Sequence, residues 1–572
     1  MLSFFKGNIK ETILAPFFKL LEALMDLFVP LVVAYIINEG VGKADDAVIF
    51  KAAGLLLLLA ILGMAFSFTA QYFAANASVS YAGKLRQSLF EHIQTFSYKE
   101  IDTLGTDTLI TRITSDVNQV QSGLNLALRL LLRSPFIVFG VMIMAFTIDA
   151  KSAMIFLVAI PVLGLVVYFI MLKSIPLYTR AQDSLDSLSK HSRENLDGVR
   201  VIRAFNHEEE EVKEFNRRSE AITRINETVG SLSAYMNPLT YAIVNIATIV
   251  LIRNGAIYVG NGTLNQGNVV ALYNYMAQII IELIKLASLT ITINRSLACA
   301  RRISSIFGIE TSIEYKDEDH HDSQNDCKVE FDDVSFGYEK EAEDAISDIS
   351  FKVKEKQIIG IIGGTGSGKS TIVNLIPRFY DVSKGAIRID GIDVRDYRKG
   401  ELIKKIGIVP QKAVLFSGSI RENLKWGNED ASDEELYEAL RIAQALEVVE
   451  SKPGRLDEPV EQGGRNFSGG QRQRLTIARA LVKKPEILIL DDSASALDFL
   501  TDFRLRKAIS ELNMTIFIVS QRSSSVMNCD RIIVMDDGKL VGYGDHKKLL
   551  EENRVYQEIY YSQFPKEVSD EK

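Results

Sequence analysis

Six long apolar segments occupy roughly the first half of this 572-residue chain and constrain its fold more than any other feature. Each is close to the ~20 residues that an α-helix needs to cross the hydrocarbon core of a bilayer. Their approximate ranges are Ile13–Ile37, Ala52–Phe73, Leu126–Ile148, Ala153–Leu172, Pro238–Val259 and Val269–Ile293. The sequence therefore predicts a membrane-spanning, all-α first half.

The composition supports a membrane portion and argues against two other classes. Hydrophobic residues make up 47% of the chain, which is high for a soluble protein. The formal net charge of −8 argues against a nucleic-acid partner, since such proteins are usually basic. The first apolar run leads into a span of membrane length without a small-residue cleavage pattern, so we expect no signal peptide. Cys299, Cys327 and Cys529 have no ligand spacing and predict neither disulfides nor a zinc site.

The connections between the spans alternate in length and in charge. Short ones run over 38–46, 149–152 and 260–268, and long polar ones over 74–125 and 173–237. The long connections are rich in Arg and Lys, whereas the short ones hold only Lys43 and Lys151. By the positive-inside rule, the long connections and both termini face the cytoplasm, as expected for a multi-pass protein of the cytoplasmic (inner) membrane.

The long connections read as helices that project beyond the bilayer, because they lack the Gly and Pro punctuation of loops. Their turning points fall near Ser97–Leu104 and Phe205–Val212. We expect short transverse helices there that dock on a cytoplasmic domain; ordinary solvated loops are the alternative.

Groups of charged residues lie inside the first, third and sixth predicted spans. Lys19, Glu22 and Asp26 share one helix face by their spacing, and span three carries Arg129 and Arg133. Span six carries Glu282 and Lys285. Ionisable groups in a membrane usually pair or serve function. Two interpretations stay open: a structural ion-pair network, or an acidic site for cationic substrates.

A P-loop organises the second half of the chain. Residues 363–370 read GGTGSGKS and follow an apolar β-rich run, and the next residues open a helix. Backbone N–H groups in such a loop cradle phosphates, and the helix N-terminus adds positive potential. We expect Lys369 to reach the β- and γ-phosphates of a nucleotide and the Ser370 hydroxyl to ligate Mg²⁺.

Three further residues fit a nucleotide site. The run EILIL at 486–490 ends in Asp491, a carboxylate at the C-terminal end of a strand and suited to Mg²⁺. Gln411 follows the apolar strand 406–409, where it could bind Mg²⁺ and sense the γ-phosphate. Tyr338 could stack on a nucleobase, although a core tyrosine is the alternative.

The sequence Ser468-Gly469-Gly470-Gln471, between the P-loop and Asp491, carries a family resemblance. The chain resembles ATP-binding-cassette (ABC) exporter half-transporters over nearly its whole length. The resemblance implies a multi-domain membrane protein: a six-helix transmembrane domain (1–309), a linker (310–327) and an α/β P-loop ABC ATPase domain (328–572). It also implies a dimer in which each ATP lies between one chain's P-loop and the other's SGGQ signature.

The resemblance assigns roles to individual residues. Tyr338 matches the adenine-stacking aromatic, Gln411 the Q-loop glutamine, Asp491 the Mg²⁺-organising carboxylate and Asp498 the D-loop at the dimer seam. The expected ATP contacts are Tyr338, Gly363, Gly364, Thr365, Gly366, Ser367, Gly368, Lys369, Ser370, Thr371, Ser468, Gly469, Gly470, Gln471 and Asp498, and the expected Mg²⁺ ligands are Ser370, Gln411 and Asp491.

Two positions depart from the family pattern. Asp492 stands where the family has the Glu that polarises the attacking water, and Gln521 stands where it has a His that contacts the γ-phosphate. The shorter carboxylate lies about 1.5 Å farther from a water that must come within about 3 Å. A Gln side chain can donate a hydrogen bond but cannot become cationic. Together they indicate a site that binds ATP better than it hydrolyses it.

The predicted function is ATP-driven export of hydrophobic or amphipathic compounds by one subunit of a heterodimeric ABC exporter. The expected partners are a second half-transporter with intact catalytic Glu and His, the lipid bilayer and a hydrophobic small molecule, and no nucleic acid. The alternatives are lipid or peptide export, or an ATP-gated regulator or pore. Six spans exclude a soluble ABC ATPase.

Overall fold

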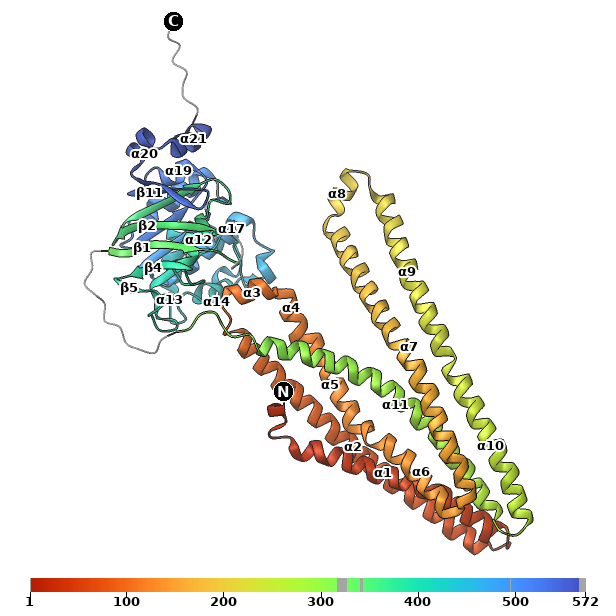
Figure 1. Cartoon of the computed structure of the whole chain (residues 1–572). Helices are drawn as coiled ribbons and strands as arrows, with labels where there is room; N and C mark the ends of the chain where they lie inside the picture. Colours follow the sequence, from red (N-terminus) through yellow and green to blue (C-terminus); the bar gives the residue numbers. More distant parts are fainter. Residues whose placement is uncertain (1, 316–326, 340–342, 494, 565–572) are drawn as a thin grey trace. The chain divides into compact units, whose positions relative to one another are not determined.

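The computed structural model describes residues 2–315, 327–339, 343–493 and 495–564. The chain divides into two compact units: Met1–Gln94 with Thr106–Ile309, and Thr95–Gly105 with Glu310–Lys572 (Figure 1). Most of the expected linker, with the pair His320-His321, lies outside the described residues.

The first unit is all-helical and confirms the six predicted spans, since six of its helical stretches are long and apolar enough to cross a membrane. Its elements are η1 (Leu2–Phe5), α1 (Ile9–Tyr35), η2 (Ile36–Val41), α2 (Asp46–Ile93), α4 (Thr106–Thr111), η3 (Arg112–Asp116), α5 (Val117–Leu126), η4 (Ala127–Leu131), α6 (Arg133–Ile148), α7 (Ala150–Asp197), α8 (Val199–Ala204), α9 (Glu208–Ala234), α10 (Met236–Gly260) and α11 (Gln266–Phe307).

The core of the helical unit forms where α1, α6, α7, α10 and α11 meet. The Tyr275 hydroxyl donates to the Leu27 carbonyl at 2.6 Å and so fixes α11 to α1. A Cβ at Gly140 would come within 2.4 Å of the Leu27 side chain, so a glycine is needed at this position for α6 to pack this closely against α1. Large apolar side chains such as Leu57 and Leu58 stay exposed, as a lipid-facing surface requires.

The second turning point differs from the expectation of a helix at 205–212. The short helix is α8, six residues earlier, and the chain turns at Phe205–His207, where Asn206 adopts a left-handed φ of 57°. Residues from Glu208 onward belong to α9, whose first turn holds four glutamates. Acidic groups stabilise a helix N-terminus, which explains why α9 begins there.

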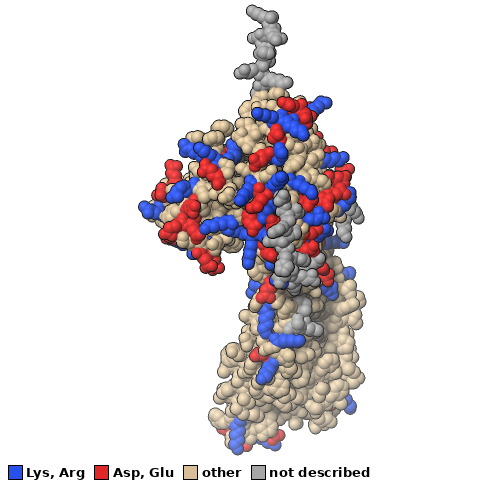
Figure 2. Space-filling view, turned by 90° about the vertical axis from the view of Figure 1, so that its left-hand side faces the viewer, with Lys and Arg blue, Asp and Glu red and all other residues tan. Residues whose placement is uncertain are grey.

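The second unit is α/β and contains three sheets. Its strands are β1 (Cys327–Phe336), β2 (Ile346–Lys354), β3 (Ile358–Gly363), β4 (Lys384–Ile389), β5 (Ile392–Asp393), β6 (Ile406–Val409), β7 (Gly418–Ser419), β8 (Pro459–Val460), β9 (Ile487–Asp491), β10 (Thr515–Val519), β11 (Arg531–Asp536) and β12 (Lys539–Gly544). The orders are β12-β11-β3-β10-β9-β6, β2-β1-β4-β5 and β7-β8. Charged side chains crowd the surface of this unit in Figure 2, whereas few mark the helical unit on that face.

Short helices flank these sheets. They are α3 (Tyr98–Leu104), α12 (Lys369–Leu375), α13 (Glu401–Lys405), α14 (Ile420–Lys425), α15 (Asp433–Ile442), α16 (Leu446–Glu450), η5 (Arg455–Asp457), η6 (Gln462–Gly464), α17 (Gly469–Val482), α18 (Phe499–Ser510), α19 (Ser523–Val526), α20 (His546–Glu552) and α21 (Arg554–Gln563). In the six-stranded sheet β11, β3, β10, β9 and β6 run parallel, so their carboxyl ends share one edge.

Helix α3 forms at the first turning point and packs in the ATPase unit, as expected from the sequence. A capping box between Ser97 and Glu100 begins it. The Tyr98 ring lies 4.5 Å from that of Phe379, and the Tyr380 hydroxyl donates to Asp102 at 2.7 Å. These contacts hold α3 within the second unit.

The start of the expected linker is partly buried, although its charged composition predicts an exposed segment. Ile313 is only 5% exposed, and Arg378 donates to the Glu314 carbonyl at 3.0 Å. The Ser312 amide donates to Glu100. These contacts hold residues 312–314 against the ATPase unit, and one buried isoleucine explains why a charge-rich stretch packs there.

Candidate functional site

The P-loop lies at the edge where β3, β9 and β10 end. Val519 of β10 pairs with both Ile361 and Asp491, so the residues after β9 and β10 must flank the loop after β3. Gly366 and Gly368 have φ angles of 82° and 90°, which favour glycine. A Cβ at Gly363 would come within 2.2 Å of the Met535 carbonyl oxygen. These glycines let the backbone curl tightly before α12.

A cavity of about 370 Å³ lies at this edge. It brings together residues of the P-loop, the ends of three strands and β1–β2. Its lining residues are Tyr338, Ala345, Thr365, Gly366, Gly368, Lys369, Ser370, Thr371, Gln411, Asp491, Asp492, Val519, Ser520 and Gln521. Ala345, Val519 and Ser520 were missed by sequence reasoning, because apolar and small side chains in such segments carry no distinguishing pattern.

Lys369 extends back across the loop. Its ammonium donates to the carbonyl oxygens of Gly363 and Gly364, and burial lowers its pKa against the attraction of Asp492 and Asp491. A cation beside a glycine-rich loop that precedes a helix is suited to bind a phosphate chain.

Ser370 and Asp491 meet at the cavity floor. The Ser370 hydroxyl donates to Asp491 at 3.0 Å, and Gln411 lines the same cavity. Burial raises the pKa of Asp491, although the Ser370 hydrogen bond and Lys369 oppose that rise. A hydroxyl, an amide oxygen and a carboxylate are hard oxygen donors, so these residues fit Mg²⁺ that is shared with phosphate oxygens.

Asp492 and Gln521 also line the cavity, as expected. Asp492 has a left-handed φ of 44°, a conformation that Asp tolerates better than most residues. Burial raises the pKa of its carboxyl, while a hydrogen bond from Gln411 opposes the rise. Gln521 accepts through its backbone carbonyl from Gln563 at 2.8 Å, so its backbone is fixed at the cavity rim.

Tyr338 is half-exposed at the opposite wall. Its hydroxyl lies 3.1 Å from the Thr371 hydroxyl, and its ring packs edge-on against Phe336 and Tyr380. At 44% exposure Tyr338 is not a core tyrosine, and its stacking on a base stays a prediction. His546 lies elsewhere: it bonds to the Tyr556 hydroxyl at 2.7 Å in the turn that begins α20.

The signature residues are not among those that line the P-loop cavity of the same chain. Ser468 caps α17, since its hydroxyl accepts from the Gln471 amide while the Gln471 side chain accepts from the Ser468 amide. A Cβ at Gly470 would come within 3.0 Å of the Ala496 carbonyl oxygen. Asp498 similarly caps α18. Ser468, Gly469 and Asp498 are exposed.

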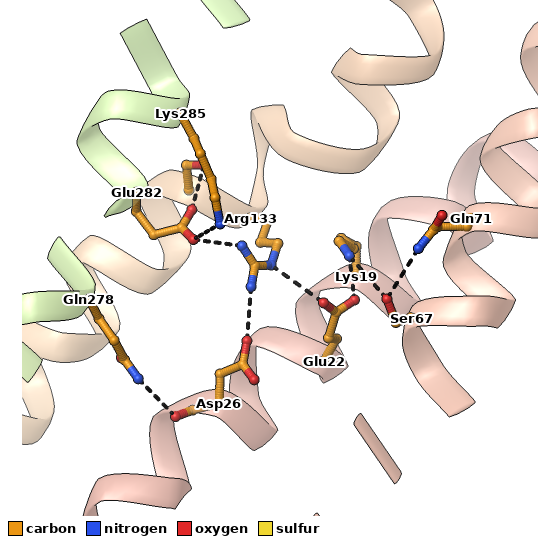
Figure 3. Close-up of polar contacts among 10 residues, drawn as sticks. Lys19, Glu22, Asp26, Ser67, Gln71, Arg133, Gln278, Glu282 and Lys285 are labelled. Atoms are coloured by element: carbon orange, nitrogen blue, oxygen red, sulfur yellow. Dashed lines mark hydrogen bonds and ion pairs between the residues drawn. The ribbon is translucent and has the colours of Figure 1, made fainter. Parts of the chain in front are cut away.

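The charged residues of the helical unit form an ion-pair network that Figure 3 shows in close-up. Arg133 of α6 is its centre: it donates to Glu282 of α11 at 2.7 Å and to Asp26 of α1 at 2.9 Å, and lies 3.9 Å from Glu22. The pairing of span one with span three is therefore confirmed for Arg133. Arg129 makes none of the ion pairs found in the described residues, and its Nε is buried without a partner.

Polar residues that sequence reasoning missed complete this network. Ser67 accepts from Lys19 at 3.4 Å, Ser134 donates to Glu282 at 2.8 Å, and Gln278 donates to the Asp26 carbonyl. Lys285, which the sequence had singled out together with Glu282, pairs with Glu282 at 3.0 Å. Isolated serines and glutamines within apolar helices are common, so their sequence positions did not single them out.

Two family models match the chain, and together they cover its two units. The "ABC transporter transmembrane region" matches residues 12–283, and the "ABC transporter" model matches residues 346–495. The ABC transporter ATP-binding protein YfiB of Bacillus subtilis, named as uncharacterized, is 35% identical and covers 100% of this chain and 99% of its own length.

Two further similarities extend this comparison. An ATP-dependent lipid A-core flippase of Desulfotalea psychrophila is 34% identical over 84% of each chain. The solved structure of a bacterial Atm1-family ABC exporter with ATP bound has a TM-score of 0.82 at 23% identity and covers 97% of this chain and 99% of its own. The latter establishes a shared fold.

Proposed function

Since the chain belongs to the ABC transporter family and is an ATP-hydrolysing membrane transporter of the exporter fold, we propose that it is one subunit of a heterodimeric exporter whose own P-loop forms the weaker of two ATP sites. One observation carries this proposal. Asp492 and Gln521 face the P-loop cavity, whereas the intact signature Ser468-Gly469-Gly470-Gln471 does not line it.

The P-loop residues bind the phosphates in this proposal. Lys369 neutralises the β- and γ-phosphates, the loop amides donate to their oxygens, and Tyr338 stacks on the base. Ser370, Gln411 and Asp491 would hold Mg²⁺, which supplies charge neutralisation on the phosphate oxygens. Asp492 is too short to orient the attacking water well, and Gln521 cannot supply positive charge to the γ-phosphate.

The signature of this chain serves the partner's ATP. The Ser468 hydroxyl and the free amides at the start of α17 stabilise the γ-phosphate bound to the partner's P-loop, where an intact Glu and His act. The long connections and both termini lie in the cytoplasm, and the protein resides in the cytoplasmic membrane. The exported compounds are hydrophobic or amphipathic small molecules, because they reach the helical unit through the bilayer.

Paired substitutions in the purified complex with the partner test this proposal. Ser468→Ala should nearly abolish ATP turnover, although it leaves this chain's own P-loop intact. Asp492→Asn should reduce turnover much less, because it removes an already poor base. ATPase rates at saturating ATP give the comparison. Equal damage by the two substitutions would mean that this chain's own site is the working one.

A further inference from the structure

A second cavity, of about 400 Å³, lies between α1 and α2 within the helical unit. It is lined by Glu22, Met25, Asp26, Val29, Leu59, Ala60, Gly63, Met64, Ser67 and Phe68. Asp26 lies near the middle of the span in α1, and Gly63 near the middle of the span in α2. The cavity is therefore level with the centre of the bilayer, where only apolar or charge-compensated ligands are stable.

Two cations of the network, Lys19 and Arg133, lie behind the cavity wall, and two of its carboxylates, Glu22 and Asp26, line the cavity. Lys19 and Arg133 are 6% and 9% exposed, and neither lines the cavity. The Asp26 side chain is 43% exposed; its Oδ2 accepts from Arg133, while its Oδ1 accepts no hydrogen bond from any residue that the structure describes. The polar wall thus presents an open carboxylate oxygen (Figure 3).

We propose that this cavity binds an amphipathic organic cation, with Asp26 as its counter-ion. The assignment names a substrate class and rests on the proposed export function for its physiological role. Phe68 and the thioethers of Met25 and Met64 form a polarisable wall that suits the apolar body and the charge of such a ligand. The volume lies within the range of ~300–1,000 Å³ that is typical of sites for drug-sized ligands.

The chemistry of the wall excludes other ligand classes. An anion would face Glu22 and Asp26 at mid-membrane with the basic groups buried behind them. A bare metal ion would find too few ligands, and no cluster of three or more His, Cys, Asp or Glu residues able to hold a metal occurs among the residues described. A neutral ligand without a donor would leave the open oxygen of Asp26 without a polar partner at mid-membrane.

Occupation of the cavity changes the packing of α1. Arg133 holds Asp26 on α1 and Glu282 on α11. A ligand cation at Asp26 competes with Arg133 for that carboxylate and leaves Arg133 paired with Glu282. Binding therefore loosens the connection of α1 to α6 and keeps the connection of α6 to α11. The ion pairs of Arg133 therefore differ between the empty and the occupied cavity.

Two probes of equal shape and opposite charge test the site. Tetraphenylphosphonium and tetraphenylborate are offered to the full chain in lipid nanodiscs without nucleotide, and binding is measured by equilibrium dialysis against empty nanodiscs. We expect saturable binding of tetraphenylphosphonium alone. Asp26→Asn, which keeps the side-chain shape, should lower the affinity about tenfold, equivalent to ~1.4 kcal/mol. Glu39→Gln, in η2 directly after α1 and outside the cavity, is the matched control.

Two further variants keep the proposal falsifiable. In Gly63→Leu every charge remains, but the added side chain fills the cavity, where a Cβ meets only Met25 at 3.9 Å. It should abolish binding, even if Asp26→Asn does not fold. Glu282→Gln removes a carboxylate of the network that does not line the cavity. Unchanged affinity in both Asp26→Asn and Gly63→Leu, or equal losses in Asp26→Asn and Glu282→Gln, would overturn the assignment.

Transport separates this proposal from the proposed function. In inverted vesicles that contain the complex with its partner, ATP should drive tetraphenylphosphonium uptake. Binding that depends on Asp26 without any ATP-driven uptake would refute export and leave the site standing. ATP-driven uptake of tetraphenylphosphonium that Asp26→Asn and Gly63→Leu leave unchanged would refute the site and leave export standing.

Discussion

At the residue scale, the two aspartates after β9 have different surroundings. Asp491 accepts a hydrogen bond from the Ser370 hydroxyl. Asp492 accepts one from Gln411, and the charges of Arg522 and Lys369 attract its carboxylate. Restoring Asp492→Glu together with Gln521→His should raise ATP turnover at this chain's P-loop, because the longer carboxylate then reaches the attacking water and the imidazole reaches the γ-phosphate. Single-turnover hydrolysis in the complex, with the partner's P-loop lysine substituted, isolates this site.

The control for that experiment is His546→Gln, because His546 bonds to Tyr556 outside the cavity and should not affect hydrolysis. Turnover by the unaltered chain equal to that of the doubly substituted chain would contradict the weak-site interpretation.

Arg133 should contribute more to stability than Lys285, although both pair with Glu282. Arg133 is buried and contacts carboxylates on two helices, whereas the Lys285 side chain is 42% exposed. Removing one partner of a buried ion network costs about 3–5 kcal/mol, because the remaining charges lose their compensation. Thermal unfolding in detergent should show a large loss for Arg133→Gln and a small one for Lys285→Gln. Similar losses would count against the central role of Arg133.

At the element scale, the hydroxyl of Tyr380 gives α3 a polar contact with the aromatic residues beside the nucleotide cavity. Tyr380 donates to Asp102 and packs against Tyr338. Tyr380→Phe should weaken α3 docking by about 1 kcal/mol, the usual net value of one hydrogen bond. Hydrogen exchange of Tyr98–Leu104 in the full chain should then accelerate. Tyr543→Phe, which removes a bond to the Lys352 carbonyl, should leave that exchange unchanged.

Asp390 should make the ATPase unit sensitive to acid. It accepts from Lys328 at the start of β1 and from Lys405 at the end of α13. Burial favours its neutral form, but these two cations outweigh burial and hold its pKa below 3.8. The ionised carboxylate therefore contributes its full stabilisation at pH values above the pKa of Asp390 in the unfolded chain. This contribution is lost as the pH falls through the lower pKa of the folded state.

The measurement is the unfolding midpoint of the ATPase unit in the full chain between roughly pH 6 and pH 3. Asp390→Asn should lower the midpoint near neutral pH, and the difference from the unaltered chain should shrink below about pH 4. Asp430→Asn, at an exposed position, serves as the comparison. If the difference in unfolding midpoint between Asp390→Asn and the unaltered chain stayed constant with pH, the charge of Asp390 would not be its cause.

At the scale of the whole molecule, the proposed orientation predicts which surfaces are accessible from each side of the membrane. Leu196, near the end of α7, is 75% exposed, and the Lys43 side chain in a short connection is 65% exposed. With the three native cysteines replaced by serine, a membrane-impermeant maleimide should label Leu196→Cys only from the cytoplasmic side. It should label Lys43→Cys only from the outside. Labelling of both from one side would refute the orientation.

Local patterns in the sequence determined that the chain has a helical membrane unit and an α/β ATPase unit. They also identified most of the residues that line the nucleotide cavity. Apolar runs of membrane length allow only helices, because every backbone polar group must be satisfied within the segment. The P-loop, Asp491 and Gln411 each follow a short apolar run. Such runs became parallel strands in one sheet, whose carboxyl ends meet at one edge, so these side chains converge without further information.

Only the tertiary structure decided the long-range pairings. The spacing of Lys19, Glu22 and Asp26 showed a shared face but not its partner; Arg133 meets Asp26 and Glu282 because α1, α6 and α11 pack together. Packing likewise left one oxygen of Asp26 open toward a cavity. The physical reason is that a contact between distant residues depends on which helix faces meet, and helical periodicity defines a face without naming its neighbour.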